Sequence, residues 1–168
     1  AVWVTRVAFR PSDDFLGYLA ELFNTPYIWG SAGVPPRTHQ AERLIGSDCA
    51  DFIVYGARRA GKQIPYKASY HIPEAARHIA RAEKVDGKGR FVDGAGKPLP
   101  IGPKSIQPGD VLLFPRHVGA LVEDLPPLGV LDVHDRMVHT YWAPPCIQPI
   151  EDTAYADSSV QVLRYDFD

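Results

Sequence analysis

The sequence has few of the features that mark disulfide-stabilised, nucleic-acid-binding or membrane proteins. Its 168 residues include only two cysteines, Cys49 and Cys146, so at most one disulfide bond can form within the chain. The 18 lysines and arginines are balanced by 20 aspartates and glutamates and form no long basic run, so nothing favours nucleic acid as a partner. No apolar stretch approaches the length of a membrane span, and Arg6 interrupts the apolar opening before a signal-peptide core could form. We therefore expect a small molecule or a peptide as the partner.

The sequence also lacks the spacings of common metal and nucleotide sites. His39, His71, His78 and His134 show no His-x-x-x-His spacing, and no cysteine pair accompanies them, so neither a metal nor a cofactor is expected. The glycine-rich segment 86–97 lacks the complete phosphate-loop pattern and precedes no convincing helix. Hairpin turns explain that segment better than nucleotide binding.

The composition and the order of the patterns predict a single α+β domain over residues 1–168. A hydrophobic content of 45 % and an aromatic content of 11 % are typical of one globular domain with a real core. The first half contains three helical patterns, at residues 13–23 with Ser12 as cap, 49–60 and 73–84. The second half contains short apolar or alternating runs at residues 111–115, 117–123, 136–142 and 160–165. Helices followed by strands predict helices packed on an antiparallel sheet.

Cys49 is the first candidate for a functional residue. It stands in the first turn of a predicted helix, just behind the capping candidates Ser47 and Asp48. Unpaired backbone N–H groups and the positive end of the helix dipole favour a thiolate there, and the thiolate is the nucleophilic form of cysteine. The small or apolar residues of this helix recur every three or four positions: Cys49, Phe52, Ile53, Gly56, Ala57 and Ala60. Taken alone, a cysteine on such a stripe is more often an inert small hydrophobe than a nucleophile.

Two histidines in the second half are candidate partners for Cys49. His117 opens the predicted strand 117–123, and His139 lies within the predicted strand 136–142. Because alternate side chains share one face of a strand, pairing of these strands would place both imidazoles on the same face. A base beside the thiol and a polar group that orients the base are what nucleophilic catalysis by cysteine requires. For either histidine alone, a structural role is the simpler explanation.

Five short motifs follow one another in order around Cys49. They are the aromatic loop PYIWGSAG, the helix SDCADFIVYGARRAG, the turn QPGD, the strand start HVG and the segment MVHT. Each motif alone is weak, but five in order around one cysteine are much harder to produce by chance. Together, over residues 26–141, they resemble the NlpC family of cell-wall cysteine peptidases, which has a compact papain-like fold.

The resemblance implies an activity and three catalytic residues. It implies that Cys49 is the nucleophile, that His117 is the general base and acid, and that His139 orients His117. The implied reaction is hydrolysis of peptidoglycan stem peptides between γ-linked D-glutamate and a diamino acid, such as meso-diaminopimelate or lysine, without a cofactor. The implied location is the bacterial cell envelope, periplasmic or secreted, and no export signal is expected within the printed residues.

The same motifs supply candidate substrate-binding residues. Tyr27 and Trp29 belong to the aromatic loop and would shape the cleft, although aromatic residues there could simply be packing. Asp48 matches the aspartate that the family carries beside its nucleophile, where it could bind a substrate amine. A role as helix cap is an equally good explanation of Asp48.

The sequence departs from the family pattern close to Cys49. Ala50 and Asp51 stand where the family has Ser-Gly, and Ser31 replaces the second glycine of the aromatic loop. These three positions are expected to border the substrate, so the bond specificity of the family does not carry over directly.

The connection between the two candidate histidines is longer than the tight hairpin usual in the family. It contains Asp132, His134 and Asp135, which are rivals of His139 for the third catalytic role. We prefer His139, because it alone stands in an apolar strand whereas the rivals belong to a polar loop.

Two other functions remain open on these residues. A papain-like acyltransferase or amidase would use the same side chains but could pass the acyl group to a nucleophile other than water. A catalytically silent module would bind cell-wall peptides without cleaving them, and its Cys49 would resist alkylation.

Overall fold

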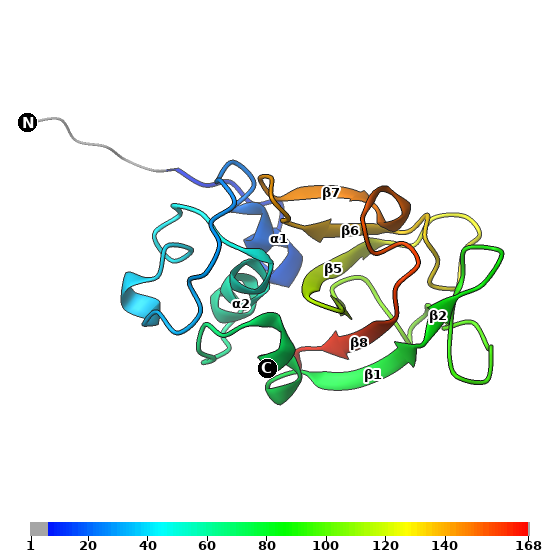
Figure 1. The fold of residues 1–168 in the computed structure, drawn as a ribbon. Helices are drawn as coiled ribbons and strands as arrows, with labels where there is room; N and C mark the ends of the chain where they lie inside the picture. Colours follow the sequence, from blue (N-terminus) through cyan, green and yellow to red (C-terminus); the bar gives the residue numbers. More distant parts are fainter. Residues whose placement is uncertain (1–6, 168) are drawn as a thin grey trace, which may run out of the picture.

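Within residues 7–167, two α-helices and a six-stranded antiparallel sheet make up an α+β fold, as the order of the sequence patterns predicts (Figure 1). The computed structural model describes residues 7–167. The helices are α1 (Phe15–Ala20), α2 (Cys49–Arg59) and the 3-10 helices η1 (Pro36–Thr38), η2 (Ser69–Glu74) and η3 (Ile150–Asp152). The longest of them, α2, has 11 residues, and no helix in the described part of the chain could cross a bilayer.

The main sheet has the strand order β1-β8-β4-β5-β6-β7, and every neighbouring pair is antiparallel. Its strands are β1 (Arg77–Ala82), β4 (Val111–Phe114), β5 (His117–Glu123), β6 (Arg136–His139), β7 (Cys146–Pro149) and β8 (Val160–Arg164). Two short strands, β2 (Lys84–Val85) and β3 (Phe91–Val92), pair separately. Because β4, β5 and β6 are consecutive neighbours, the two candidate histidines stand on adjacent strands, as predicted.

Helix α2 begins at Cys49, as the sequence predicts, because Asp48 caps it. The Asp48 side chain accepts a hydrogen bond of 2.9 Å from the N–H of Asp51, which satisfies one of the donors that a helix start leaves free. In α1 the cap is Asp14, whose carboxylate accepts a 2.8 Å bond from a first-turn N–H. The expected cap, Ser12, instead donates its hydroxyl to Asp14.

A buried apolar layer holds α2 in place. Helix α1 packs on α2 at Gly56, where an added Cβ would lie 2.5 Å from Leu19 Cδ2, so a residue with a side chain would force the helices apart. The other side of α2 contacts β5, whose Val118 and Ala120 belong to the same buried cluster as Cys49. The expected packing of the first helix against the Cys49 helix is confirmed, and Figure 1 shows both helices on one side of the sheet.

Two segments differ from the sequence prediction. The helix expected over residues 73–84 is wrong, because residues 77–82 form β1, which pairs with β8. Alanine and charged side chains give this segment helical propensity, but the C-terminal strand offers it a row of backbone hydrogen-bond partners. The sequence prediction also lacks β7, which follows two prolines and pairs with β6 at the opposite edge, a position where proline is tolerated.

Candidate active site

Cys49 is the first residue of α2 and lies against the start of β5. The residue is only 6 % exposed, and the backbone N–H of Val118 lies near its sulfur, where it favours the ionised form. The N–H groups of Cys49 itself and of Ala50 also lie near the sulfur. The thiol is therefore held between the helix start and the residue that follows His117.

The surroundings of Cys49 favour the neutral thiol over the thiolate. Burial raises the pKa of Cys49 to about 12, and the nearby negative charge of Asp48 acts in the same direction. The Val118 and Ala50 N–H groups act in the opposite direction, but their effect is smaller. The helix start was expected to favour a thiolate, and this expectation is not met because the loss of solvation outweighs the partial charge of the helix end.

His117 and His139 are in direct contact. Strands β5 and β6 pair with Ala120 opposite Val138, and His117 Nε2 lies 2.8 Å from His139 Nδ1. Both rings are buried. Burial lowers the pKa of His117 to about 3 and that of His139 to about 4, and repulsion from His139 adds to the effect on His117. At neutral pH both imidazoles are therefore uncharged.

The hydrogen bond between the two rings links their protonation states. Among residues 7–167, His117 Nδ1 and His139 Nε2 have no hydrogen-bond partner, and Cys49 forms no direct hydrogen bond with His117. If His117 Nδ1 is to accept a proton, its own proton must sit on Nε2 and be donated to His139 Nδ1. In that arrangement His139 carries its proton on Nε2 and orients His117 as an acceptor.

The rivals of His139 serve the connection between β5 and β6 instead. The two oxygens of Asp135 accept 2.8 Å and 2.9 Å bonds from the N–H groups of Leu125 and Asp132. Asp132 in turn accepts a 2.8 Å bond from the His134 N–H, and the His134 ring lies 3.1 Å from the Glu151 carboxylate. None of these contacts involves His117, so the structure brings His139 rather than its rivals to the candidate base.

Aromatic rings that the sequence prediction did not include surround His117. The Tyr155 ring stacks on the imidazole with 4.6 Å between centroids and an interplanar angle of 11°, and Tyr141 meets it edge-on at 5.2 Å. Trp142 continues this group, with its ring 6.0 Å from that of Tyr141. Tyr141 and Trp142 follow His139 closely in the sequence, which is a usable signal, but Tyr155 lies in a polar segment without any such signal.

Of the two aromatic residues proposed for substrate binding, Tyr27 is placed close to the thiol. The Ile28 N–H donates to the Ser47 carbonyl at 3.1 Å, which ties the aromatic loop to the residue before the cap of α2. The Tyr27 hydroxyl is buried without a partner among the described residues, and burial together with the charge of ionised Cys49 raises the Tyr27 pKa. Trp29 is 68 % exposed and stacks on Trp142 with 6.0 Å between centroids.

Two of the three positions that depart from the family pattern, Ser31 and Asp51, belong to a buried polar cluster rather than to a substrate border. Asp51 is fully buried and accepts a hydrogen bond from the Ser31 hydroxyl. His39, also fully buried, has its Nε2 atom 3.3 Å from Asp51 Oδ1. The N–H of Ala41 donates to His39 Nδ1 at 3.2 Å, so the histidine carries its proton on Nε2, facing the carboxylate. The cluster fastens the aromatic loop to the first turn of α2.

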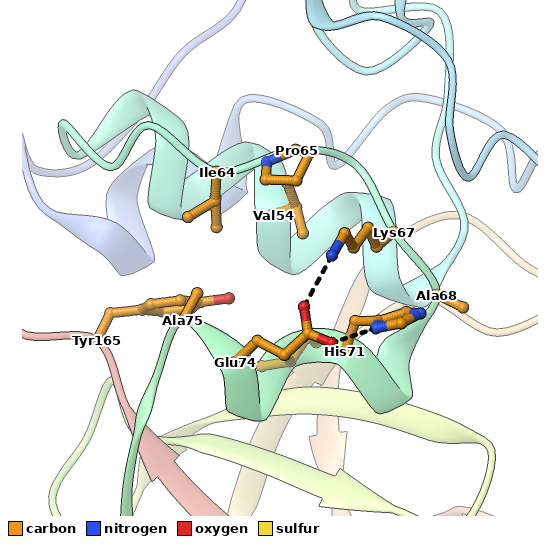
Figure 2. A pocket seen from close by; sticks show the side chains of 10 residues that line it. Val54, Ile64, Pro65, Lys67, Ala68, His71, Glu74, Ala75 and Tyr165 are labelled. Carbon is orange, nitrogen blue, oxygen red and sulfur yellow. Dashed lines mark hydrogen bonds and ion pairs between the residues drawn. The ribbon is translucent and has the colours of Figure 1, made fainter.

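The cavity drawn in Figure 2 lies elsewhere on α2. It has a volume of about 230 Å³ between α2, η2 and the end of β8, and its walls include Val54, Ile64 and Tyr165. In its wall Glu74 contacts Lys67 at 2.7 Å and His71, its neighbour in η2, at 2.6 Å, as Figure 2 shows. Neither Cys49 nor either candidate histidine lines this cavity.

Comparison with known proteins adds no relative to this picture. None of the known protein-family models matches the chain, and no curated protein matches it in sequence. Within residues 7–167 no three histidine, cysteine or acidic side chains gather as metal ligands would. The chemistry of the site therefore has to be argued from its own side chains.

Proposed function

We propose that this protein is a cysteine peptidase that hydrolyses peptidoglycan stem peptides, at the bond between γ-D-glutamate and a diamino acid, and that its fold is papain-like. The observation that carries the proposal is the 2.8 Å contact of His117 with His139 beside the helix start that holds Cys49. A thiol at a helix start, a histidine at the start of a neighbouring strand and a second histidine behind it are the parts that this chemistry needs.

The resting site contains a neutral thiol and a neutral imidazole. Because the pKa of Cys49 is about 12 and that of His117 is about 3, a stable thiolate–imidazolium pair is disfavoured. Proton transfer from Cys49 Sγ to His117 Nδ1 then accompanies the attack on the substrate carbonyl instead of preceding it. The bound substrate draws the thiol to Nδ1, since catalytic hydrogen bonds often tighten only in the complex.

The two halves of the reaction use the same groups. Cys49 Sγ bonds to the carbonyl carbon, the C–N bond of the peptide breaks, and His117 gives the proton it has taken to the departing amine. Water then loses a proton to His117 and attacks the acyl-enzyme, releasing the carboxylic acid and returning the thiol. Backbone N–H groups at the start of α2 and the free Tyr27 hydroxyl are available to stabilise the oxyanion.

The silent binding module is the second candidate, and one observation favours it. Cys49 is 6 % exposed, has a raised pKa and forms no direct hydrogen bond with His117. A protein of this kind would bind stem peptides without turnover. An acyltransferase or amidase shares every step up to the acyl-enzyme, so the products formed with and without an added amine distinguish it from a peptidase.

Mass spectrometry of defined muropeptides after incubation with the protein tests the proposal. Wild-type protein is expected to split tripeptide and tetrapeptide stems at the γ-glutamyl bond. Cys49→Ala and His117→Ala should be inactive, and Cys146→Ala is the matched control that should keep full activity. Binding of the same muropeptides by wild-type protein without any cleavage would establish the silent module instead.

A further inference from the structure

Arg116 occupies the tight turn that leads into the candidate catalytic base. Phe114, the last residue of β4, pairs directly with His117, the first residue of β5, so the hairpin turn consists of Pro115 and Arg116 alone. Arg116 is therefore joined directly to the first residue of β5. The side chain of Arg116 leaves the chain one residue before the imidazole.

The backbone of Arg116 is strained. Its φ angle is +67°, in the left-handed region that favours glycine or asparagine. A turn with proline first and a positive φ second has the pattern of a type II turn, where glycine is the usual second residue. Arginine is unfavourable there because its Cβ crowds the backbone, and such strain is concentrated at binding and catalytic sites. The requirements of the turn therefore do not explain why arginine stands at position 116.

The charge of Arg116 is uncompensated. Most arginines of this protein pair with a carboxylate within 4 Å: Arg10, Arg58, Arg59, Arg77, Arg81, Arg90, Arg136 and Arg164. The exposed guanidinium of Arg116 has no hydrogen bond or ion pair within residues 7–167. Its charge favours the ionised form of Tyr155, the ring stacked on His117.

Arg116 also lines a pocket whose walls combine apolar and polar side chains. The pocket has a volume of about 390 Å³ and lies where η2 meets the ends of β4 and β8. Ser69, Tyr70 and Gln161 contribute neutral polar groups. The other cation in its wall, Arg81, is paired with Glu83 at 2.8 Å, so the free positive charge of this pocket is that of Arg116.

We propose that Arg116, with the pocket that it lines, binds a carboxylate of the substrate beside the scissile bond. The inference rests on the proposed function, because a γ-linked glutamate leaves its α-carboxylate free next to the bond that is cut. A diamino acid such as meso-diaminopimelate also has a free carboxylate. The planar guanidinium matches a carboxylate with two parallel N–H···O bonds, and the neutral walls of the pocket leave the charge available for it.

Matched substrates test the proposal. Two stem peptides are compared with the free acid: one amidated at the α-carboxyl of glutamate and one amidated at the diamino acid. Wild-type protein should cleave the free acid with a higher kcat/KM than at least one of the amides, by about tenfold to a hundredfold, as expected for a hydrogen bond to a charged group. The amide with the lower kcat/KM identifies which of the two carboxylates is bound.

Variants at position 116 separate charge from conformation. Arg116→Asn removes the charge, tolerates the positive φ and should cleave acid and amide equally well. Arg116→Lys keeps the charge and should retain part of the preference. Arg77→Gln, which removes an exposed arginine paired with Asp166 at 3.1 Å, is the control for net charge and should behave as wild type. Unchanged turnover of the amide by Arg116→Asn shows that His117 has not moved.

The outcomes distinguish failure of the inference from failure of the proposed function. If the wild-type protein cleaves acid and amides alike, the inference is overturned and the peptidase stands. If it cleaves no stem peptide, the proposed function fails, and the Arg116 Nε–H resonance is followed during titration with glutarate, the bare dicarboxylate skeleton of glutamate. A saturable shift of this resonance, without a comparable shift of the Arg77 Nε–H resonance, supports a carboxylate site, and the lack of one overturns it.

Discussion

Iodoacetamide labelling of Cys49 as a function of pH measures the ionisation on which the proposed chemistry depends. The reagent reacts with the thiolate, so the rate follows the thiolate population multiplied by access to the sulfur. Burial raises the pKa of Cys49 to about 12, so roughly one molecule in 100,000 carries a thiolate at pH 7. An ordinary cysteine, with a pKa near 8.5, is ionised to a few per cent at this pH. Cys49 should therefore react about a thousandfold more slowly than an ordinary thiol.

Cys146 is the internal reference for this experiment. It is partly exposed, and burial raises its pKa as well, although it is less deeply buried than Cys49. Peptide mapping by mass spectrometry after short labelling times should show modification of Cys146 first at pH 7. The rate at Cys49 should rise about tenfold per pH unit above neutrality without levelling off near pH 7, since a thiolate population grows in this way below its pKa.

A His117→Ala variant completes the labelling test. If the resting pair is neutral, loss of His117 should leave the slow labelling of Cys49 in the free protein nearly unchanged. Labelling of Cys49 that is fast and levels off below pH 7, and that His117→Ala slows, would refute the reasoning from burial. It would show that the helix start and an imidazolium together outweigh desolvation, and the site would then rest as an ion pair.

Three further predictions concern the histidine pair and the cluster behind α2. His117→Ala should abolish turnover of muropeptides, whereas His139→Gln should keep a measurable fraction of kcat, because an amide oxygen can still accept the His117 hydrogen bond. Burial lowers the pKa values of both histidines below 6.5, so the unfolded chain takes up protons first and the free energy of unfolding should fall between pH 6.5 and about 4. Urea titrations at several pH values should show a shallower fall of the free energy of unfolding in His139→Gln than in wild type. Asp135, whose pKa is raised to about 7, acts in the opposite direction, but it is present in both proteins and cancels in the comparison. Ser31→Ala removes a donor to the buried Asp51 carboxylate and should lower the free energy of unfolding by about 1–3 kcal/mol, and wild-type stability would contradict this contact.

The parts of the fold that repeat a local pattern can be predicted from the sequence. Helix α2 is marked by its cap and by an apolar stripe with helical spacing, and β5 and β6 are marked by short apolar runs between turn residues. Strand β1 is different, because its own residues favour a helix and only the distant strand β8 makes it extended. Strand β7 is equally dependent on its partner, since a four-residue strand that follows a proline and ends in another carries too little periodicity to be recognised.

Some features of the candidate site can be predicted from the sequence and others cannot. The choice of His139 over Asp132 follows from the apolar strand in which His139 alone stands, and the structure does bring His139 to His117. The stacking of Tyr155 on His117 depends on the path of an irregular segment between β7 and β8, for which the sequence offers no pattern. The protonation of Cys49 could not be predicted either, because the helix start is visible in the sequence whereas the depth of burial is set by all the elements around it.

The contact between Ser31 and Asp51 has a consequence for how this sequence can change. Both residues stand at positions where the family that the chain resembles has glycine, and here one supplies a buried carboxylate and the other a hydroxyl that bonds to it. If Ser31 is replaced first, the buried Asp51 carboxylate lacks one of its donors. If Asp51 arises in a sequence that still has glycine at position 31, the buried carboxylate lacks the same donor. Mutational paths between the two patterns should therefore pass through a weakened intermediate, and the two positions should be exchanged together when the loop is redesigned.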